Sequence, residues 1–373
     1  MDSVDPWYLE NIVCPIDQSR LRFDGQKLIS EDGRSYPVVE GVPVLLIDND
    51  KQTIGLARAS IERAQGRSEI VDQRASQLYL ESLGLSDDEK AEVARLWKGG
   101  LTAIDPVVAM IIGATCGNAY KGSARKLGLN EYPIPSIRLA PAAVGDLLLD
   151  IGCNWGRWSI AAARKGFSTV GIDPSLGAIM AAKRIANDLK LDVKYIVADA
   201  RYLPFRNERF SCVYSYSVLQ HFDKEDARRT LVEVGRVLKP GGLAKIQMAN
   251  KFGIRSIQQQ LSRRSRPSEV FEVRYWTIGE LRSTFHQIIG ETRISADCYF
   301  GLGWQWSDFR YMAQMYKLAL IASELLRRLS GVVAPMCWMA DSVFCIAVKS
   351  SAIGAEEDSQ TRAVLAPGLE TPG

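Results

Sequence analysis

The chain has 373 residues, of which 47% are hydrophobic and 24% are charged. This composition is typical of a globular protein and excludes fibrous and wholly disordered classes, and the length favours two domains. The 46 basic and 43 acidic residues leave a formal net charge of only +3. Whole-molecule attraction to a polyanion would therefore be weak, so we expect no DNA partner.

Cysteine usage and the absence of targeting signals bear on location. The seven cysteines are odd in number, scattered and never spaced as CxxC, which argues against a disulfide framework. The first residues, MDSVDPWYLENIV, carry acidic side chains where a secretory signal needs positive charge. Charged residues interrupt the best apolar run near the C-terminus, so no stretch of about 18 apolar residues occurs. Together these features predict a cytoplasmic protein.

Two segments of different character come before the first strongly apolar strand. Residues 1–50 contain short apolar runs separated by the turn signals DG and EG, which predicts a small β-rich domain. Residues 51–140 are predicted to form a helical connector. One of its helices is expected at 86–97, because Ser86 and Glu89 have the spacing of a capping box.

Strand and helix patterns alternate through residues 141–350. The wholly apolar run 147–149 fits a central strand that is buried on both faces of a parallel sheet. We predict strands at 146–151, 168–172, 193–198, 210–215, 242–248, 291–299 and 342–349. The alternation indicates an α/β fold with a doubly wound, seven-stranded, mostly parallel sheet. The polar segment 351–373 is predicted to be a disordered tail.

The segment LLLDIGCNWGRWSIAAARKG combines a strand, a tight glycine turn and the start of a helix. Gly152 and Gly156 let the backbone approach a ligand. Asn154 lies between them, and asparagine is one of the few residues that tolerate a positive φ. Asp173 follows the next strand, where a carboxylate can accept both hydroxyl hydrogens of a ribose. This pattern predicts a nucleotide-type cofactor and still fits an NAD enzyme.

The third strand distinguishes the two classes, because VKYIVADARYLPF places Asp199 and Ala200 at the carboxyl edge of the sheet, where an adenine amino group would lie. The motifs DIGCNWG, GIDPS, ADARYLPF, YSYSVLQHF and RVLKPGG follow in order. Their order and spacing resemble class I (Rossmann-like) S-adenosylmethionine-dependent methyltransferases, especially the small-molecule group that includes quinone-biosynthesis enzymes. The resemblance is close over 146–250 and loose to about 349.

The resemblance implies S-adenosylmethionine as the cofactor. The glycine turn would line its methionine moiety, Asp173 its ribose and the end of the third strand its adenine, while Tyr216 would lie on the methyl-donor side. The complete predicted set of cofactor-binding residues is Asp150, Gly152, Asn154, Gly156, Asp173, Asp199, Ala200 and Tyr216.

Gln220 and His221 end the loop after the fourth strand, at the edge where substrates meet cofactors in such sheets. Because a sulfonium is already an activated methyl donor, the protein mainly has to align the nucleophile, and a base is needed only for a protonated acceptor such as a hydroxyl. His221 is the best candidate base, since an imidazole ordinarily titrates near neutral pH. The alternative is a histidine that only anchors the loop or shapes the substrate site.

The N-terminal segment has a resemblance of its own. CPIDQSRL followed by SEDGRSYPVVEGVPVLL is similar to zinc-ribbon-like domains of the tRNA-methyltransferase-activator type. Zinc members carry CPxC and CxxCG, whereas here Asp17, Ile29 and Asp32 replace three of the cysteines and only Cys14 remains. One thiol and two carboxylates do not make a closed zinc site, so we expect no metal. The expected apolar core is Leu21, Leu28, Tyr36, Val38, Val42 and Val44. The segment is either an internal cover for the catalytic domain or a surface that binds a partner.

Two later segments are less specific. A basic cluster contains Arg255, Arg263, Arg264, Arg266 and Arg274. It would hold an anionic group of the substrate or form a solvated loop. The insertion between the last two strands has a broad apolar helical pattern. It would pack in the core, cap a hydrophobic substrate or make peripheral membrane contact through residues 309–339.

These observations favour an enzyme that methylates a small, partly apolar metabolite at oxygen. One alternative is an rRNA or tRNA methyltransferase, because some of those join a zinc ribbon to the same fold. The lost cysteines, the near-neutral charge and YSYSVLQHF in place of an Asn/Asp-Pro-Pro-aromatic motif disfavour RNA. The other alternative is a non-catalytic partner protein that retains the fold, which the intact cofactor motifs disfavour.

Overall fold

The computed structural model describes residues 4–48, 55–66, 78–100, 102–115, 129–262, 272–301 and 303–350. The predicted tail 351–373 and three arginines of the basic cluster, at 263, 264 and 266, lie outside these residues. In the described part of the chain, no helix is long and apolar enough to cross a membrane.

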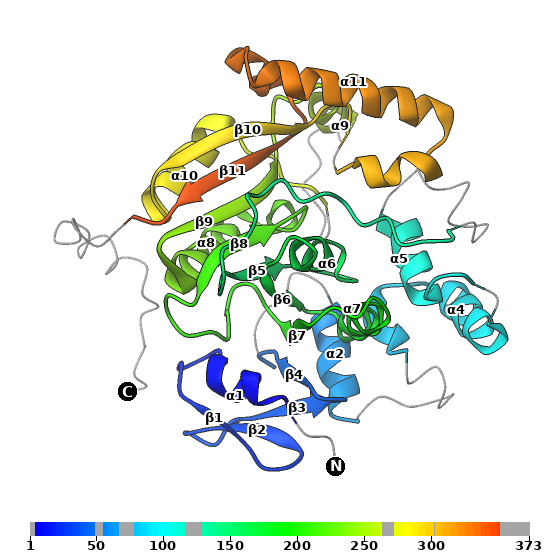
Figure 1. Cartoon of the computed structure of the whole chain (residues 1–373), viewed down its shortest axis with the longest axis vertical. Coiled ribbons are helices and arrows are strands. Elements are labelled where there is room, and N and C mark those ends of the chain that lie inside the picture. The colour runs from blue at the N-terminus through cyan, green and yellow to red at the C-terminus, as the bar shows by residue number, and fades with distance from the viewer. Residues whose placement is uncertain are drawn as a thin grey trace.

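A single eleven-stranded sheet forms the centre of the molecule, in the order β1-β2-β3-β4-β7-β6-β5-β8-β9-β11-β10 (Figure 1). Its catalytic part consists of β5 (Leu147–Ile151), β6 (Ser168–Asp173), β7 (Val193–Ala198), β8 (Phe210–Ser215), β9 (Leu238–Ala249), β10 (Thr292–Cys298) and β11 (Ser342–Val348). Strands β5 to β9 are parallel, and β11 runs antiparallel to both β9 and β10. The predicted α/β class and its seven mostly parallel strands are confirmed.

The N-terminal segment extends this sheet. Its strands are β1 (Leu21–Phe23), β2 (Lys27–Ser30), β3 (Ser35–Val39) and β4 (Val42–Leu45). β1 to β4 pair antiparallel, and β4 then pairs in parallel with β7. Figure 1 shows the segment in blue beside that edge of the catalytic sheet. The sequence predicted its β-rich character but not that it continues the catalytic sheet.

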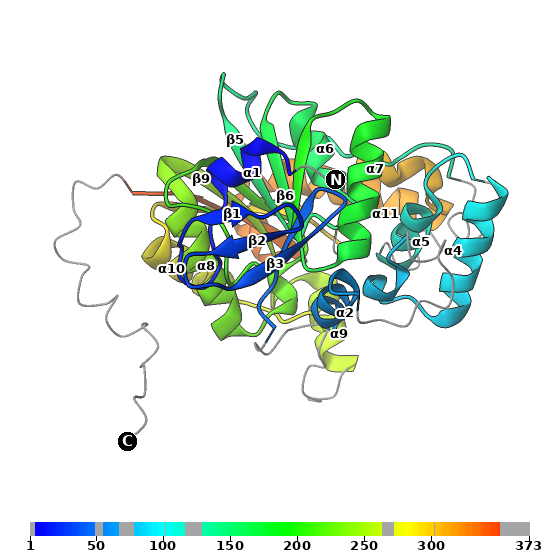
Figure 2. The ribbon, with the colours of Figure 1, turned by 90° about the horizontal axis from the view of Figure 1, so that it is seen from below.

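Helices cover both faces of the sheet. The helices of the described residues are α1 (Pro6–Asn11), α2 (Leu56–Ala64), η1 (Leu80–Leu83), α4 (Asp87–Gly99), α5 (Pro106–Thr115), α6 (Arg157–Ala163), α7 (Leu176–Asp188), η3 (Leu219–His221), α8 (Lys224–Val237), α9 (Ile254–Ser262), α10 (Ile278–Ile288), η4 (Trp306–Tyr311), α11 (Gln314–Ser330) and η5 (Ala334–Met339). α8 and α10 pack on one face, and α6 and α7 pack on the other (Figures 1 and 2). The capping box of Ser86 and Glu89 forms as predicted and opens α4.

The N-terminal segment shares its core with the catalytic domain. Five of its six predicted core residues are buried, and Val38 packs against them while partly exposed. Leu28 belongs to the same apolar cluster as Leu149 of β5, and Val44 packs in a cluster with Tyr195 of β7. Apolar burial in this segment therefore stabilises both parts of the sheet together.

Residues 303–340 cover the edge of the sheet at which the parallel strands end. η4, α11 and η5 lie there, and in the sequence they come between β10 and β11 (Figure 1). η4 is anchored to α6, since Arg157 pairs with Asp308 and donates a 2.9 Å hydrogen bond to Ser307. Because β5 to β9 all end at this edge, the covering segment lies over the region where the predicted site residues gather.

Candidate active site

The glycine turn after β5 adopts the backbone that its sequence predicted. Gly152, Asn154 and Gly156 have φ angles of +71°, +50° and +82°. A side chain at Gly152 would clash with Val218, and one at Gly156 would clash with the hydroxyl of Tyr195. Only glycine therefore fits at these two positions, while asparagine supplies the third left-handed residue as expected.

Asp173, at the end of β6, is tied directly to this turn. Its Oδ2 accepts the backbone N–H of Asn154 at 3.1 Å, and its Oδ1 accepts the N–H of Ser175 at 2.9 Å. Desolvation by burial raises the pKa of Asp173 to about 6. The two hydrogen bonds lower this pKa, but their effect is the smaller one. Each carboxylate oxygen has a second lone pair, so the group retains the capacity to accept ribose hydroxyls.

Asp150, also in the predicted cofactor set, is buried at the end of β5. Its Oδ2 accepts a 2.7 Å hydrogen bond from the hydroxyl of Ser159 in α6. Burial raises the pKa of Asp150 to about 7, and the negative charge of Asp173 adds to the effect. The side chain thus joins the strand to the helix that follows the turn, and its contact with a cofactor stays a prediction.

Asp199 and Ala200 lie at the end of β7, where the sequence placed them. The sequence did not predict the partner of Asp199, which is Arg201. Arg201 donates to the Asp199 carboxylate from Nη2 at 2.7 Å and from its backbone N–H at 2.9 Å. It also reaches Asp226 of α8 at 3.2 Å. The guanidinium of Arg201 thus holds the Asp199 carboxylate in place. An adenine amino group would share that carboxylate with the guanidinium.

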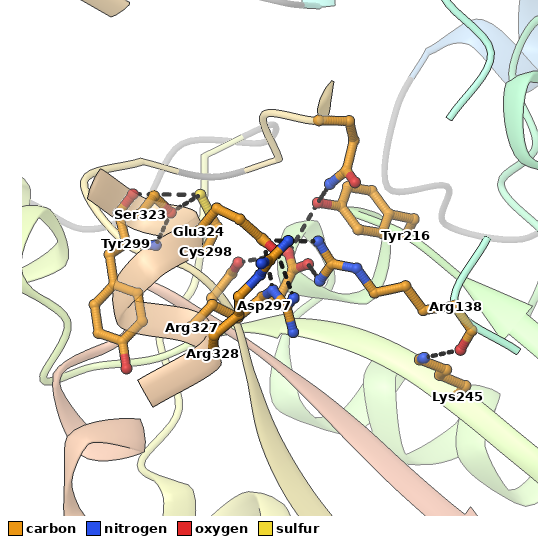
Figure 3. Close-up of polar contacts among 12 residues, drawn as sticks. Arg138, Tyr216, Lys245, Asp297, Cys298, Tyr299, Ser323, Glu324, Arg327 and Arg328 are labelled. Atoms are coloured by element: carbon orange, nitrogen blue, oxygen red, sulfur yellow. Dashed lines mark hydrogen bonds and ion pairs between the residues drawn. The ribbon is translucent and has the colours of Figure 1, made fainter. Parts of the chain in front are cut away.

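Tyr216 follows β8 and is surrounded by aromatic rings and by polar side chains, and Figure 3 shows its polar contacts. Its hydroxyl donates to Asp297 Oδ2 at 2.8 Å and accepts from the amide of Gln305 at 2.8 Å. Its ring centroid lies 4.6 Å from that of Trp158 and 5.9 Å from that of Phe344. Sequence reasoning missed Asp297 and Gln305. An acid at the end of a late strand was the available signal for the first of them.

Asp297 connects this side of the site to the covering segment. It is buried and accepts a 2.9 Å hydrogen bond from Ser342, and its Oδ1 lies 3.7 Å from Nη1 of Arg138. The other terminal nitrogen of Arg138 is 3.5 Å from Glu324 of α11 (Figure 3). Burial raises the pKa of Asp297, and the charge of Arg138 lowers it. A continuous series of polar contacts thus runs from Tyr216 through Asp297 and Arg138 to α11.

Gln220 and His221 lie together in η3. Gln220 is buried and donates a 2.7 Å hydrogen bond to the hydroxyl of Ser217. Arg274 holds the backbone of both, because its N–H donates to the Gln220 carbonyl at 2.7 Å and its guanidinium donates to the His221 carbonyl at 2.5 Å. Arg274, which sequence reasoning left between an anion site and a solvated loop, fixes the loop that carries both predicted catalytic residues.

Other contacts occupy the positions of the lost cysteines. Cys14 Sγ lies 3.2 Å from the hydroxyl of Tyr36, and Arg34 pairs with Asp17 at 2.8 Å and also with Asp32. Among the residues that the structure describes, no group of three or more His, Cys, Asp or Glu is arranged to hold a metal. An ion pair and a thiol–phenol contact thus link the turns of this segment.

The N-terminal segment also contacts the strand that carries the predicted adenine site. The hydroxyl of Tyr8 donates to the Tyr195 carbonyl at 2.9 Å and accepts the Tyr195 N–H at 3.1 Å. The side chain of Tyr195 in turn fills the space beside Gly156. The segment therefore supports the backbone on which the cofactor side is built, as an internal cover would.

Comparisons with known proteins identify the domain that contains these residues. Residues 148–242 match the family model of a methyltransferase domain. The chain is 33% identical over 163 residues to the ubiquinone biosynthesis O-methyltransferase of Azorhizobium caulinodans. The matched residues make up 44% of this chain and 63% of that protein. It is 29% identical over 177 residues to the same-named enzyme of Nitrobacter winogradskyi, covering 44% of this chain and 66% of that protein. The matches thus span less than two thirds of the length of these relatives.

Solved structures give distant matches. The complex of the Haloferax volcanii Trm112 methyltransferase activator with a methyltransferase has a TM-score of 0.40 at 18% identity, covering 57% of this chain and 85% of that one. The phosphoethanolamine N-methyltransferase 2 of Haemonchus contortus, bound to phosphomonomethylethanolamine and S-adenosylhomocysteine, has a TM-score of 0.38 at 20% identity, covering 57% and 51%. The sequence matches identify a class I S-adenosylmethionine-dependent methyltransferase domain in this chain, and the turn and the strand-end aspartates lie within the matched residues.

Proposed function

We propose that this protein transfers a methyl group from S-adenosylmethionine to a hydroxyl oxygen of a small, partly apolar acceptor. The observation that carries the proposal is the junction of the glycine turn with Asp173, through the hydrogen bond from the Asn154 N–H. This junction brings the left-handed backbone turn and the carboxylate proposed to bind the ribose to one point at the carboxyl edge of the sheet. The relatives named O-methyltransferases support oxygen as the atom that is methylated.

The residues of the turn fit the proposed cofactor. The Oδ1 atom of Asn154 is buried and has no hydrogen-bond partner within the described structure. An amide oxygen in that state suits the ammonium group of a methionine moiety, because a buried acceptor without a donor costs free energy. Asp173 would hold the ribose, and Asp199 and Ala200 would hold the adenine. The cofactor supplies an activated methyl group on a sulfonium when it is bound.

The acceptor side is aromatic and carries two polar groups with distinct roles. The partly exposed Tyr216, which packs against the buried rings of Trp158 and Phe344, would offer ring surface to a partly apolar molecule. His221 would take the proton of an acceptor hydroxyl as methyl transfer proceeds. The positive charge would then form on the imidazole and not among the aromatic side chains. Gln220, held by Ser217, would keep the His221 loop in position. The main contribution of the remaining residues is alignment of the acceptor oxygen with the methyl group.

A methyl-incorporation screen tests this function. The purified full chain would be incubated with methyl-labelled S-adenosylmethionine and, separately, with phenolic or quinol-like small molecules and with total transfer and ribosomal RNA. We expect label in the small-molecule pool, and much less label with the Asp173→Ala protein when the cofactor concentration is low. Label in RNA alone would replace the proposed acceptor class with the nucleic-acid alternative. Cofactor binding without label in either pool would point to the non-catalytic alternative.

A further inference from the structure

Helix α11 has two faces of opposite character. On the inner face Leu320, Ser323 and Glu324 are buried, and Ser323 Oγ accepts the Tyr299 N–H at 2.9 Å (Figure 3). On the outer face Met315 and Leu318 are 76% and 70% exposed. The same outer stripe continues along the helix and beyond it through Leu325, Leu329 and Val332, which are 63%, 49% and 85% exposed. An apolar stripe this long on the outside of a domain is a typical mark of an interaction surface.

The exposed apolar surface continues next to α11. Trp338 and Met339 of η5 are about half exposed. Asn250, which lies between β9 and α9, is bound to η5, because its Nδ2 donates to the Trp338 carbonyl at 2.8 Å. Figure 1 shows α9 and α11 at the same end of the molecule. α9 contributes three more exposed apolar side chains, Ile254, Ile257 and Leu261.

Residues 250–262 and 303–340 contribute exposed charges of one sign, and one exposed acid from outside them, Glu131, pairs with Arg310 of η4. Residues 250–262 contain no acidic residue, and residues 303–340 contain only Asp308 and Glu324. Both of these acids are turned inward: Asp308 pairs with Arg157, and Glu324 pairs with Arg327, Arg328 and Arg138. Lys251, Arg255 and Arg328 are exposed. The two segments therefore present apolar side chains flanked by cations, with no exposed carboxylate of their own.

We propose that the outer face of α11, with η5 and α9, docks on an anionic lipid surface. An amphipathic helix with cationic flanks and a tryptophan at its border is suited to the interface of such a membrane, where the helix lies without spanning it. A second copy of this chain is disfavoured as the occupant, because two α11 helices paired along this stripe would bring Lys317 and Arg328 toward cations rather than carboxylates.

The inner face explains what docking would do for the proposed reaction. Glu324 contacts Arg138, Arg138 contacts Asp297, and Asp297 accepts the hydroxyl hydrogen of Tyr216 (Figure 3). A lipid surface that binds α11 would therefore also bring the acceptor side of the site close to the lipid. This step rests on the proposed function and narrows its acceptor to a molecule that partitions into the bilayer.

Vesicle co-sedimentation of the full chain tests the docking surface independently of methyl transfer. We expect the wild-type protein to sediment with vesicles of phosphatidylcholine and phosphatidylglycerol, to bind pure phosphatidylcholine far less, and to be released as salt is raised. The double variant Leu318→Glu and Leu325→Glu should lose at least about ten-fold in affinity for the mixed vesicles. The matched control is Val144→Glu with Val232→Glu, two exposed apolar residues on other surfaces, and should bind as the wild type does.

Cofactor titration of each variant would verify that it is folded. Failure of the wild-type protein to bind the mixed vesicles, or equal loss in both double variants, would overturn the docking proposal. A second result would also overturn it: no vesicle binding, together with a wild-type dimer in light scattering that the Leu318→Glu, Leu325→Glu variant does not form. The apolar stripe would then join two copies of the chain. Methyl transfer to a water-soluble acceptor without vesicles reports on the proposed function alone, so the two failures are distinguishable.

Discussion

The N-terminal segment and the covering segment 303–340 both add to the same catalytic sheet, but they are attached in different ways. The first joins through its main chain, with β4 paired to β7 and the Tyr8 hydroxyl bound to both backbone groups of Tyr195. The second joins through side chains, by the ion pairs of Arg157 with Asp308 and of Arg138 with Glu324 and by apolar residues such as Met312 and Leu320 that are buried in a cluster of the catalytic domain. Strand pairing over a shared core makes the first part of the sheet itself, whereas side-chain contacts leave the second as a cover over a finished sheet.

This difference separates two kinds of effect. Substitutions on the N-terminal and cofactor side should change stability and cofactor affinity, because that side is built from strands, turns and packed apolar residues. Substitutions on the covered acceptor side should change the rate of methyl transfer while the cofactor still binds. The following substitutions test that separation.

The largest effect is expected for His221→Ala on the acceptor side. If the imidazole takes the proton of a hydroxyl acceptor, the rate of methyl transfer should fall by about 10²- to 10⁴-fold, with cofactor affinity nearly unchanged. Single-turnover kinetics with calorimetric binding would measure both, with His286→Ala as the control. An unimpaired single-turnover rate would leave His221 as an anchor of the loop and make alignment the main source of catalysis.

On the N-terminal side, Leu28→Ala should lower the free energy of unfolding by about 2 to 5 kcal/mol, the usual cost of a cavity at a fully buried leucine. Because Leu28 belongs to the cluster that contains Leu149, the loss should appear in the one transition that unfolds the catalytic sheet. Urea unfolding followed by circular dichroism would show this. A separate early transition would mean that the N-terminal segment unfolds by itself, against the shared core.

Asp173→Asn should weaken S-adenosylmethionine binding at pH 8 by about 1 to 3 kcal/mol, because the ribose hydroxyls lose a charged acceptor. Burial raises the pKa of Asp173 to about 6, so wild-type affinity should decline as the pH falls through that value and the carboxylate becomes protonated. Calorimetry at several pH values would detect the decline. It should be missing in Asp173→Asn and retained in the exposed control Asp188→Asn.

The smallest effect is expected for Asp150→Asn, and it concerns stability. Burial raises the pKa of Asp150 to about 7 in the folded protein, while the unfolded chain has the ordinary value near 3.9. The folded state thus binds the extra proton, and wild-type stability declines as the pH rises from about 4 to 7. The variant lacks this decline and should therefore gain stability relative to the wild type over that range. Thermal or urea unfolding at pH 4 and pH 8 would give the difference, and a constant difference would contradict it.

The cofactor side could be predicted from the sequence because its signals are local. The φ angle of Asn154, the position of Asp173 and the capping box of Ser86 each depend on residues a few positions apart, where backbone sterics and hydrogen bonding decide the outcome. The roles of these residues toward a bound cofactor, and the domain boundaries at residues 50 and 140, stay predictions.

The covered acceptor side could not be predicted because its contacts join distant parts of the chain. Arg138 meets Asp297 only after the sheet has formed, and no periodicity records that pairing. The insertion was expected to have one broad apolar face, but Met315 is exposed while Leu320 is buried. When two stripes of a helix are apolar, the pattern alone does not tell which of them packs on the protein.

The central claim is most directly tested by calorimetric titration of the wild-type protein with S-adenosylmethionine, S-adenosylhomocysteine and NAD. We predict heat and a single site per chain with the first two ligands and none with NAD. The glycine turn and Asp173 alone would suit either class of cofactor, and we expect Asp199 and Ala200 at the end of the third strand to make the distinction. Heat with NAD under conditions where neither S-adenosyl compound binds would contradict the assignment.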